Sequence, residues 1–228
     1  MKVTMITKAD LDENNYYRHS YSIDVDGSIE IEGELGKVRF RGFLRAAGSI
    51  AATAGSGIKA GCGIEAGEGI EAGSWIKAGE GIKAGCGIEA GSWIEAGSWI
   101  KAGWGIKAGE GIKAGEGIKA GEGIKAGEGI EAGCGIEAGS SIEAGESIKA
   151  GWSIEAGESI EAGSSIEAGL KIIAKISITA KLRIFAGLCG WRIPKPEEMT
   201  ITAQRVEGEV CYGTVKLLGT DPASPTES

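Results

Sequence analysis

The stretch GEGIKAGEGIKAGEGIKAG, residues 109–127, gives one six-residue unit three times and begins a fourth. The same unit, G-x-[G/S/W]-I-[K/E]-A, runs without insertion from Gly55 to Ala168, which makes nineteen consecutive hexads. Isoleucine stands at every sixth position from Ile58 to Ile166. The period continues to Ala186 with more apolar residues between, so the array spans about 22 hexads.

A period of six residues favours short strands that wind into coils. An α-helix has 3.6 residues per turn, so one isoleucine every six residues would walk around its surface. Most hexads also carry two glycines, and each costs a helix roughly 1 kcal/mol. A strand of Gly-Ile-Lys/Glu-Ala instead directs isoleucine and alanine inward and the charged residue outward. We therefore expect G-x-G to form a corner with x in solvent, where glycine allows positive φ and close approach between coils.

This pattern resembles the hexapeptide-repeat left-handed β-helix, in which one aliphatic side chain per hexad points inward. The resemblance implies an all-β, single-chain parallel β-solenoid, and it favours three hexads per coil with a triangular cross-section. Trp75 and Trp93, which are 18 residues apart, suit three hexads; the spacings of 24 and 48 among Cys62, Cys86 and Cys134 suit two. Acyltransferases of this family carry a catalytic histidine and loops between coils. The array has neither, so we expect no enzymatic activity.

The flanks of the array are predicted to cover the open ends of the solenoid, which would otherwise invite polymerisation. We expect an N-terminal β cap over residues 1–47, with a β meander at 21–46, and the solenoid over residues 48–187. A C-terminal β hairpin cap is expected over residues 188–218, turning at Glu207-Gly208. The last residues, 219–228, are predicted to be disordered.

Residues that could carry catalysis or bind a metal are scarce. His19 is the only histidine, and the five cysteines form no CxxC pair, which is typical of free thiols. No phosphate-loop motif occurs. We therefore expect no catalytic residues, metal or cofactor. No run of about 18 apolar residues occurs and no apolar signal core opens the chain, which predicts a cytoplasmic protein that does not bind membranes.

Charge divides the array along its length. The stretch from Gly55 to Ala168 holds nine lysines and eighteen glutamates, and the whole chain has a net charge of −8. An acidic section with one lysine is followed by a basic group, Lys171, Lys175, Lys181 and Arg183. Such a field attracts a basic partner and repels nucleic acid. The candidate partner-binding glutamates are Glu131, Glu137, Glu143, Glu146, Glu155, Glu158, Glu161 and Glu167.

Four tryptophans within thirty residues form a second candidate interface: Trp75, Trp93, Trp99 and Trp104. None occupies the isoleucine or alanine position of its hexad, so all are predicted to point outward or to lie at corners. Aromatic patches are common at protein interfaces. The alternative is that each ring stacks over neighbouring glycines and shields the backbone.

The sequence therefore predicts a non-catalytic binding or inhibitor protein. Its rigid acidic surface would engage a basic protein partner that itself binds nucleic acid. By analogy with acidic β-helical proteins that resemble duplex DNA, it could be an anti-defence protein of a phage or mobile element. The main alternative is a structural rod or scaffold that forms a homo-oligomer through the apolar section at residues 169–193. Carbohydrate binding and acyl transfer rank below both.

Overall fold

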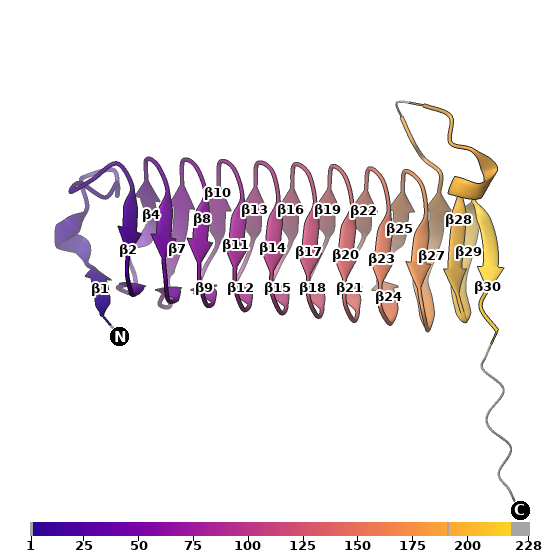
Figure 1. Ribbon diagram of the computed structural model, residues 1–228, viewed down its shortest axis with the longest axis horizontal. Helices are drawn as coiled ribbons and strands as arrows, with labels where there is room; N and C mark the ends of the chain where they lie inside the picture. The colour runs from indigo at the N-terminus through magenta and orange to yellow at the C-terminus, as the bar shows by residue number, and fades with distance from the viewer. Residues whose placement is uncertain (1, 191, 220–228) are drawn as a thin grey trace, which may run out of the picture.

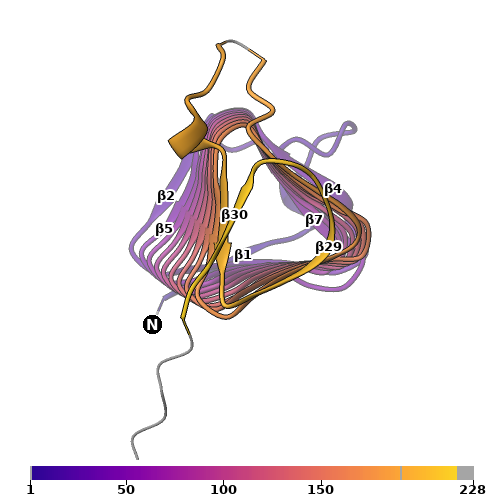
Figure 2. The same cartoon turned by 90° about the vertical axis from the view of Figure 1, so that its right-hand side faces the viewer.

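The structure is a computed structural model that describes residues 2–190 and 192–219. The chain winds into a long parallel β-solenoid, a rod with its first strand, β1 (Val3–Ile6), and its last described strand, β30 (Thr214–Leu217), at opposite ends (Figure 1). Viewed along the rod, the coils superimpose as a triangle (Figure 2). Residues 220–228 of the predicted disordered tail (219–228) lie outside the described residues, as does Trp191.

Strand register shows that one coil contains three hexads. Ile76 in β10 (Ile76–Ala78) lies between Ile58 of the preceding coil and Ile94 of the following one, at a spacing of 18 residues. Every neighbouring pair of strands in the regular array keeps this spacing, for example Ile118 with Ile100 and Ile136. The prediction of a triangular coil is therefore confirmed, and the 24-residue cysteine spacing does not reflect the coil.

Three stacks of parallel strands form the three faces of the prism. The first face contains β2 (Ile23–Val25), β5 (Leu44–Ala46), β8 (Ile64–Ala66), β11 (Ile82–Ala84), β14 (Ile100–Ala102), β17 (Ile118–Ala120), β20 (Ile136–Ala138), β23 (Ile154–Ala156), β26 (Ile172–Ala174), β28 (Thr200–Ala203) and β30 (Thr214–Leu217). The second face contains β1 (Val3–Ile6), β3 (Ser28–Ile31), β6 (Ile50–Ala52), β9 (Ile70–Ala72), β12 (Ile88–Ala90), β15 (Ile106–Ala108), β18 (Ile124–Ala126), β21 (Ile142–Ala144) and β24 (Ser159–Ala162).

The third face contains β4 (Gly36–Phe40), β7 (Ser56–Ala60), β10, β13 (Ile94–Ala96), β16 (Ile112–Ala114), β19 (Ile130–Ala132), β22 (Ile148–Ala150) and β25 (Ser165–Ala168). Two longer strands, β27 (Ser177–Ala186) and β29 (Arg205–Tyr212), cross from the second face to the third. They continue the winding beyond the regular hexads.

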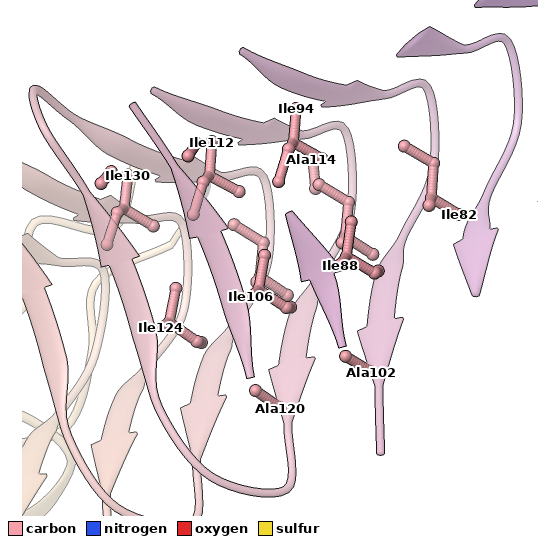
Figure 3. Packing of buried hydrophobic residues seen from close by; sticks show 14 of the residues in the cluster. Ile82, Ile88, Ile94, Ala102, Ile106, Ile112, Ala114, Ala120, Ile124 and Ile130 are labelled. Atoms are coloured by element: carbon pink, nitrogen blue, oxygen red, sulfur yellow. The ribbon is translucent and has the colours of Figure 1, made fainter. Parts of the chain in front are cut away.

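The core consists of isoleucine and alanine columns, as the alternation predicts. Each three-residue strand of the array buries its first and third residues and turns its middle residue outward, as in Ile118–Ala120. Ile118 is 1% exposed and Ala120 2%. Figure 3 shows successive isoleucines stacked from coil to coil inside the prism. Burying an isoleucine side chain contributes about 1.5–3 kcal/mol, so the repeated column supplies most of the apolar stabilisation.

From Gly61 to Gly169 glycine is required at the first position of the hexad because neighbouring coils approach closely there. A Cβ on Gly115 would overlap the carbonyl oxygen of Gly97 in the preceding coil. The predicted positive φ is wrong for the repeat beyond its first residue: among the described residues the positive-φ glycines are Gly36, Gly55, Gly187, Gly208 and Gly213, and only Gly55 belongs to the repeat. Glycine therefore occupies the first position because the neighbouring coils approach closely, and not because of its backbone conformation.

The third position of the hexad has more room. A Cβ on Gly117 would lie 3.4 Å from the carbonyl oxygen of Gly135, an ordinary contact. Serine and tryptophan replace glycine at this position in several hexads, including Trp99 and Ser153, which share the column of Gly117. Sequence variation in the repeat thus follows the space available between coils.

Both predicted caps differ from the expected topology. Residues 21–46 are not a meander, because β2 pairs in parallel with β5, Ile23 opposite Leu44. Residues 199–218 are not a hairpin, because β30 pairs in parallel with β28, Ile201 opposite Val215. The turn signal at Glu207-Gly208 is real, but it marks a bend inside β29 at which Gly208 has φ of 127°. Both flanks therefore add coils to the solenoid.

Candidate partner-binding surface

The outward residues of the three faces form ladders of lysine and glutamate, in which most lysines pair with a glutamate of a neighbouring coil. Between Gly55 and Ala168 the faces carry nine lysines and ten glutamates, so they are nearly neutral. Seven of these lysines pair with a glutamate one coil away: Lys77–Glu95 2.7 Å, Lys83–Glu65 2.8 Å, Lys107–Glu89 2.6 Å, Lys113–Glu131 3.0 Å, Lys119–Glu137 2.6 Å, Lys125–Glu143 2.5 Å and Lys149–Glu167 3.0 Å. Such exposed pairs contribute roughly 0–1 kcal/mol each and neutralise the faces.

The corners carry the surplus negative charge. We name each corner after the face that it precedes. The second residue of the hexad lies there, and between Gly55 and Ala168 it is never lysine or arginine. Eight hexads have glutamate at this position: Glu80 and Glu116 at the first corner, Glu68, Glu122 and Glu158 at the second, and Glu110, Glu128 and Glu146 at the third. Eight of the nine net negative charges of the array therefore lie at corners.

The third corner has the densest acidic ridge. Glu110, Glu128 and Glu146 lie in three successive coils, and the Glu128 amide donates to the Glu110 carbonyl at 2.7 Å while Glu146 donates to Glu128 at 2.8 Å. Neighbouring parallel strands lie about 4.8 Å apart, which sets the axial spacing of the carboxylates. Among the described residues these three carboxylates form no ion pair. We call this set the third-corner ridge.

The structure spreads the eight predicted glutamates over the whole circumference. Glu131 and Glu167 lie on the third face, Glu137 and Glu155 on the first, and Glu143 and Glu161 on the second. Five of the six are ion-paired, Glu155 with Lys171 at 2.9 Å and the other four within the ladders described above. The pKa of Lys125 is raised, chiefly by its hydrogen bond to Glu143. Only Glu146 and Glu158 belong to corners, so the acidic section is not one surface.

Sequence reasoning counted charges along the chain and missed their place in the hexad. The signal that distinguishes them is present in the sequence. Lysine and glutamate share the fifth position of the hexad, whereas the second position admits glutamate alone among charged residues. Counting each position separately would have predicted three acidic corners between neutral faces.

The four tryptophans do not lie together. Trp75 and Trp93 belong to the third corner, Trp99 to the first and Trp104 to the second. A Cβ on Gly57 would lie 2.9 Å from the Trp75 ring, and one on Gly81 would lie 2.7 Å from the Trp99 ring.

The Trp93 ring covers Gly111 in the same way, so these three rings shield the backbone of neighbouring coils. Trp104 is more open, with 61% of its surface exposed. Together with Gly87, Gly105 and Gly123 it lines an open groove of about 620 Å³.

A basic column occupies the N-terminal part of the third face. Arg39, Lys59 and Lys77 lie directly opposite one another in three successive coils. Lys37 lies beside this column, with its Nζ 4.5 Å from the centre of a Trp75 ring. Like charges at directly opposed positions are unfavourable. Positive charge is thus concentrated near the N-terminal end of this face.

The described residues contain no group of three or more His, Cys, Asp or Glu side chains that could hold a metal ion. None of their helices has the length and apolar character that a membrane span requires. Comparison with known proteins gives no match of the chain to a protein-family model, a curated protein or a solved structure.

Proposed function

We propose that this protein is a non-catalytic binding protein whose acidic corner ridges engage a basic protein partner, one that itself binds nucleic acid. The observation that carries this proposal is the separation of charge. The faces neutralise their charges in ladders, while the corners present eight glutamates of the array and no basic residue. Carboxylates that are not already paired remain available to the side chains of a partner.

The repeated backbone makes the ridges rigid. Each corner residue is held by backbone hydrogen bonds to the coils on both sides, as Glu128 is by Glu110 and Glu146. A surface that is ordered before binding loses little conformational entropy on association. We also propose that the chain is similar to the left-handed hexapeptide-repeat β-helices. A straight acidic rod of that kind carries its charges in a line, as a nucleic acid does.

The charge density sets an expectation for mimicry of nucleic acid. Duplex DNA carries one negative charge per about 1.7 Å of axis, whereas the third-corner ridge carries one per about 4.8 Å. On this proposal the partner binds duplex DNA and the rod through the same basic surface. Because DNA has the higher charge density, an excess of DNA should displace the partner from the rod. An inhibitor encoded by a phage or mobile element would act through this competition.

Two matched variants test which charges matter. The corner variant carries Glu110→Gln, Glu128→Gln and Glu146→Gln, and the face variant carries Glu131→Gln, Glu137→Gln and Glu143→Gln. Both change the net charge equally. Proteins captured from a bacterial lysate at low salt are identified by mass spectrometry for each variant. We expect nucleic-acid-binding proteins on the wild type and the face variant, released by salt and by duplex DNA, and little capture by the corner variant. Capture that ignores salt, or that both variants lose equally, rejects the proposal.

A structural role is the second candidate, because the corners change character at the C-terminal end. Beyond the acidic hexads the corner residues become Leu170, Ile176 and Leu182, and Ile176 and Leu182 are at least half exposed. Each corner of this coil thus carries one apolar residue, and exposed apolar side chains can contribute to association surfaces. Static light scattering tests this role, since a strict monomer at high concentration would exclude self-assembly through residues 169–193.

A further inference from the structure

The basic column on the third face departs from the charge pattern of the other ladders. Arg39, Lys59 and Lys77 lie directly opposite one another in three successive coils. Lys37 precedes Arg39 by two residues in β4, so its side chain points to the same outer surface. Among the described residues only Lys77 of these four pairs with a carboxylate, that of Glu95 at 2.7 Å. Like charges in directly opposed positions repel one another, so the column costs stability unless an anion lies against it.

Arg39 is held in place, but its charge has no partner. Its guanidinium carbon lies 5.4 Å from the centre of the Tyr16 ring. The Nε atom is buried without a hydrogen-bond acceptor, and the side chain forms no ion pair with any described residue. The side chain as a whole is only partly buried, which leaves its terminal nitrogens open to a ligand. A guanidinium offers five donors in a planar fork that matches the oxygen atoms of a phosphate group.

Two ammonium groups lie beside this guanidinium. Lys59 stands opposite Arg39 in the next coil, is partly buried and forms no ion pair with a described residue. Lys37 has its Nζ 4.5 Å from the centre of a Trp75 ring, which itself lies against Gly57. Opposed residues of neighbouring strands are about 4.8 Å apart, and residues two apart along a strand are separated by about 6.7 Å. Three cations without a carboxylate partner can thus reach one small anion.

The carboxylates of this region are engaged elsewhere. Glu95 belongs to the ion pair given above, and Asp12 pairs with Arg41 at 3.5 Å. The Glu34 carboxylate lies against Gly55. The third corner beside the column carries no carboxylate at the second hexad position, where serine stands in three successive coils: Ser56, Ser74 and Ser92. The described side chains therefore leave most of the positive charge of the column uncompensated.

We propose that the basic column binds a dianionic phosphate group, either inorganic phosphate or the terminal group of a phosphate monoester. Arg39 donates from its fork to the phosphate oxygens, and Lys37 and Lys59 neutralise the remaining charge. Hydrogen bonds between a guanidinium and a phosphate are assisted by charge and are among the strong ones in proteins. The bound anion also removes the repulsion between the opposed cations.

The size of the column favours a single phosphate group over a nucleic-acid chain. The column spans two strand spacings, about 9.6 Å, and Glu95 follows it on the same face. A longer polyanion would have to extend past Glu95 toward the third-corner ridge, which repels it. Proteins that bind single strands also stack bases on aromatic rings. Here the Tyr16 ring already packs against Arg39, and the Trp75 ring already packs against Lys37.

This inference goes beyond the proposed function and does not depend on it. The phosphate group binds to cations of the third face, whereas the proposed protein partner binds to glutamates of the corners. Phosphate binding can therefore fail while capture of a basic partner succeeds, and the reverse.

Titration with inorganic phosphate at constant ionic strength, followed by NMR, tests the site. The reporters are the Nε–H signal of Arg39 and the indole N–H signal of Trp75. We expect saturable shifts of both signals with a dissociation constant on the order of 1 mM, and no comparable shift with chloride. Phosphoserine tests the monoester: tighter binding than inorganic phosphate assigns the site to monoesters, and weaker binding assigns it to the free ion. A short single-stranded DNA without a terminal phosphate should bind more weakly at the same concentration of phosphate groups.

Matched variants separate the site from the net charge of the rod. Arg39→Gln and Lys59→Gln, read at the Trp75 signal, should each weaken phosphate binding at least about tenfold. Lys101→Gln removes the same charge from the other ladder lysine that forms no ion pair, and it should leave binding unchanged. Lys59→Glu places opposite charges next to one another in the column. It should raise the urea midpoint of unfolding in the absence of phosphate and abolish phosphate binding.

Four results would overturn the proposal. One is the absence of saturable shifts up to about 10 mM phosphate. Another is an equal loss of binding in Lys59→Gln and Lys101→Gln, which would show that only net charge attracts the anion. The third is tighter binding of the DNA than of phosphate, which would make the column a nucleic-acid surface. The fourth is a lower urea midpoint for Lys59→Glu, which would show that the opposed cations do not repel one another.

Discussion

At the scale of single residues, two glycines of the same hexad have different reasons to be glycine. The first lies against a carbonyl of the preceding coil, as Gly115 does against Gly97, while the third has room, as Gly117 does beside Gly135. Sequence reasoning expected close approach correctly and positive φ wrongly. The period shows that glycine recurs. Whether a side chain fits at each glycine depends on the distance between coils, which is a property of the folded solenoid.

Gly115→Ala and Gly117→Ala form a matched pair that tests this difference. Gly115→Ala should destabilise the protein by about 1–3 kcal/mol, because the new methyl group forces two coils apart. Gly117→Ala should shift stability by less than about 1 kcal/mol, since alanine also restricts the unfolded chain. Urea unfolding followed by circular dichroism measures both. Equal losses of stability for the two variants would contradict the steric account.

A second residue-scale prediction concerns Glu198 in η2 (Pro196–Glu198). Its carboxylate accepts from Arg192 at 2.7 and 2.8 Å, and hydrogen bonds from Arg192 and from the Lys195 amide lower its pKa from 4.5 to about 2. A lowered pKa favours the folded loop above pH 4.5, and this contribution disappears as the pH falls through about 2.

NMR titration of the Glu198 side-chain carboxyl carbon should give a pKa of about 2 in the wild type. The pKa should move towards 4.5 in the Arg192→Met variant, because the guanidinium provides the largest cause of the shift. A Glu198 that titrates at the same pH in both proteins would show that Arg192 does not hold the carboxylate.

At the scale of strands, the six-residue period predicted which residues are buried but not which strands pair. Alternation alone fixes the inward isoleucine and alanine of β17. Pairing in the flanks was wrong because local turn signals favour antiparallel neighbours, whereas β2 pairs with β5 across a whole coil.

The same coil length separates tryptophans that are close in sequence. Trp99 and Trp104 are five residues apart but lie at different corners, while Trp75 and Trp93 share one. A clustered patch therefore could not be inferred from linear spacing without the size of the coil.

Deletion of whole coils tests the strand register. Removing residues 109–126 takes out one coil of 18 residues, so the remaining columns of isoleucine, alanine and outward charge realign. We expect a folded rod that is shorter by about 4.8 Å. Removing residues 109–124 displaces every later isoleucine from its column, and this variant should unfold or aggregate. Circular dichroism and X-ray scattering distinguish the outcomes, and two equally folded proteins would contradict the 18-residue register.

At the scale of the whole molecule, the core, the faces and the corners of the rod have different roles. The core columns maintain the winding, the faces neutralise charge in ladders, and the corners leave glutamates unpaired. The candidate site was only partly predictable from sequence. The acidic surplus was evident from composition, but its concentration at corners follows from the three-dimensional place of each hexad position. Glu137 and Glu146, treated alike in the sequence, therefore differ: the first pairs with Lys119 at 2.6 Å and the second belongs to the third-corner ridge.

The most direct measurement of the central claim is the affinity of a captured basic partner for the corner and face variants across a range of salt concentrations. Isothermal titration calorimetry supplies both the dissociation constant and its salt dependence. We predict that the face variant binds within about threefold of the wild type, while the corner variant binds at least about tenfold more weakly, or about 1.4 kcal/mol, with a smaller salt dependence. Equal weakening of the two variants, which carry the same net charge, would show that total charge and not the corner ridge governs binding.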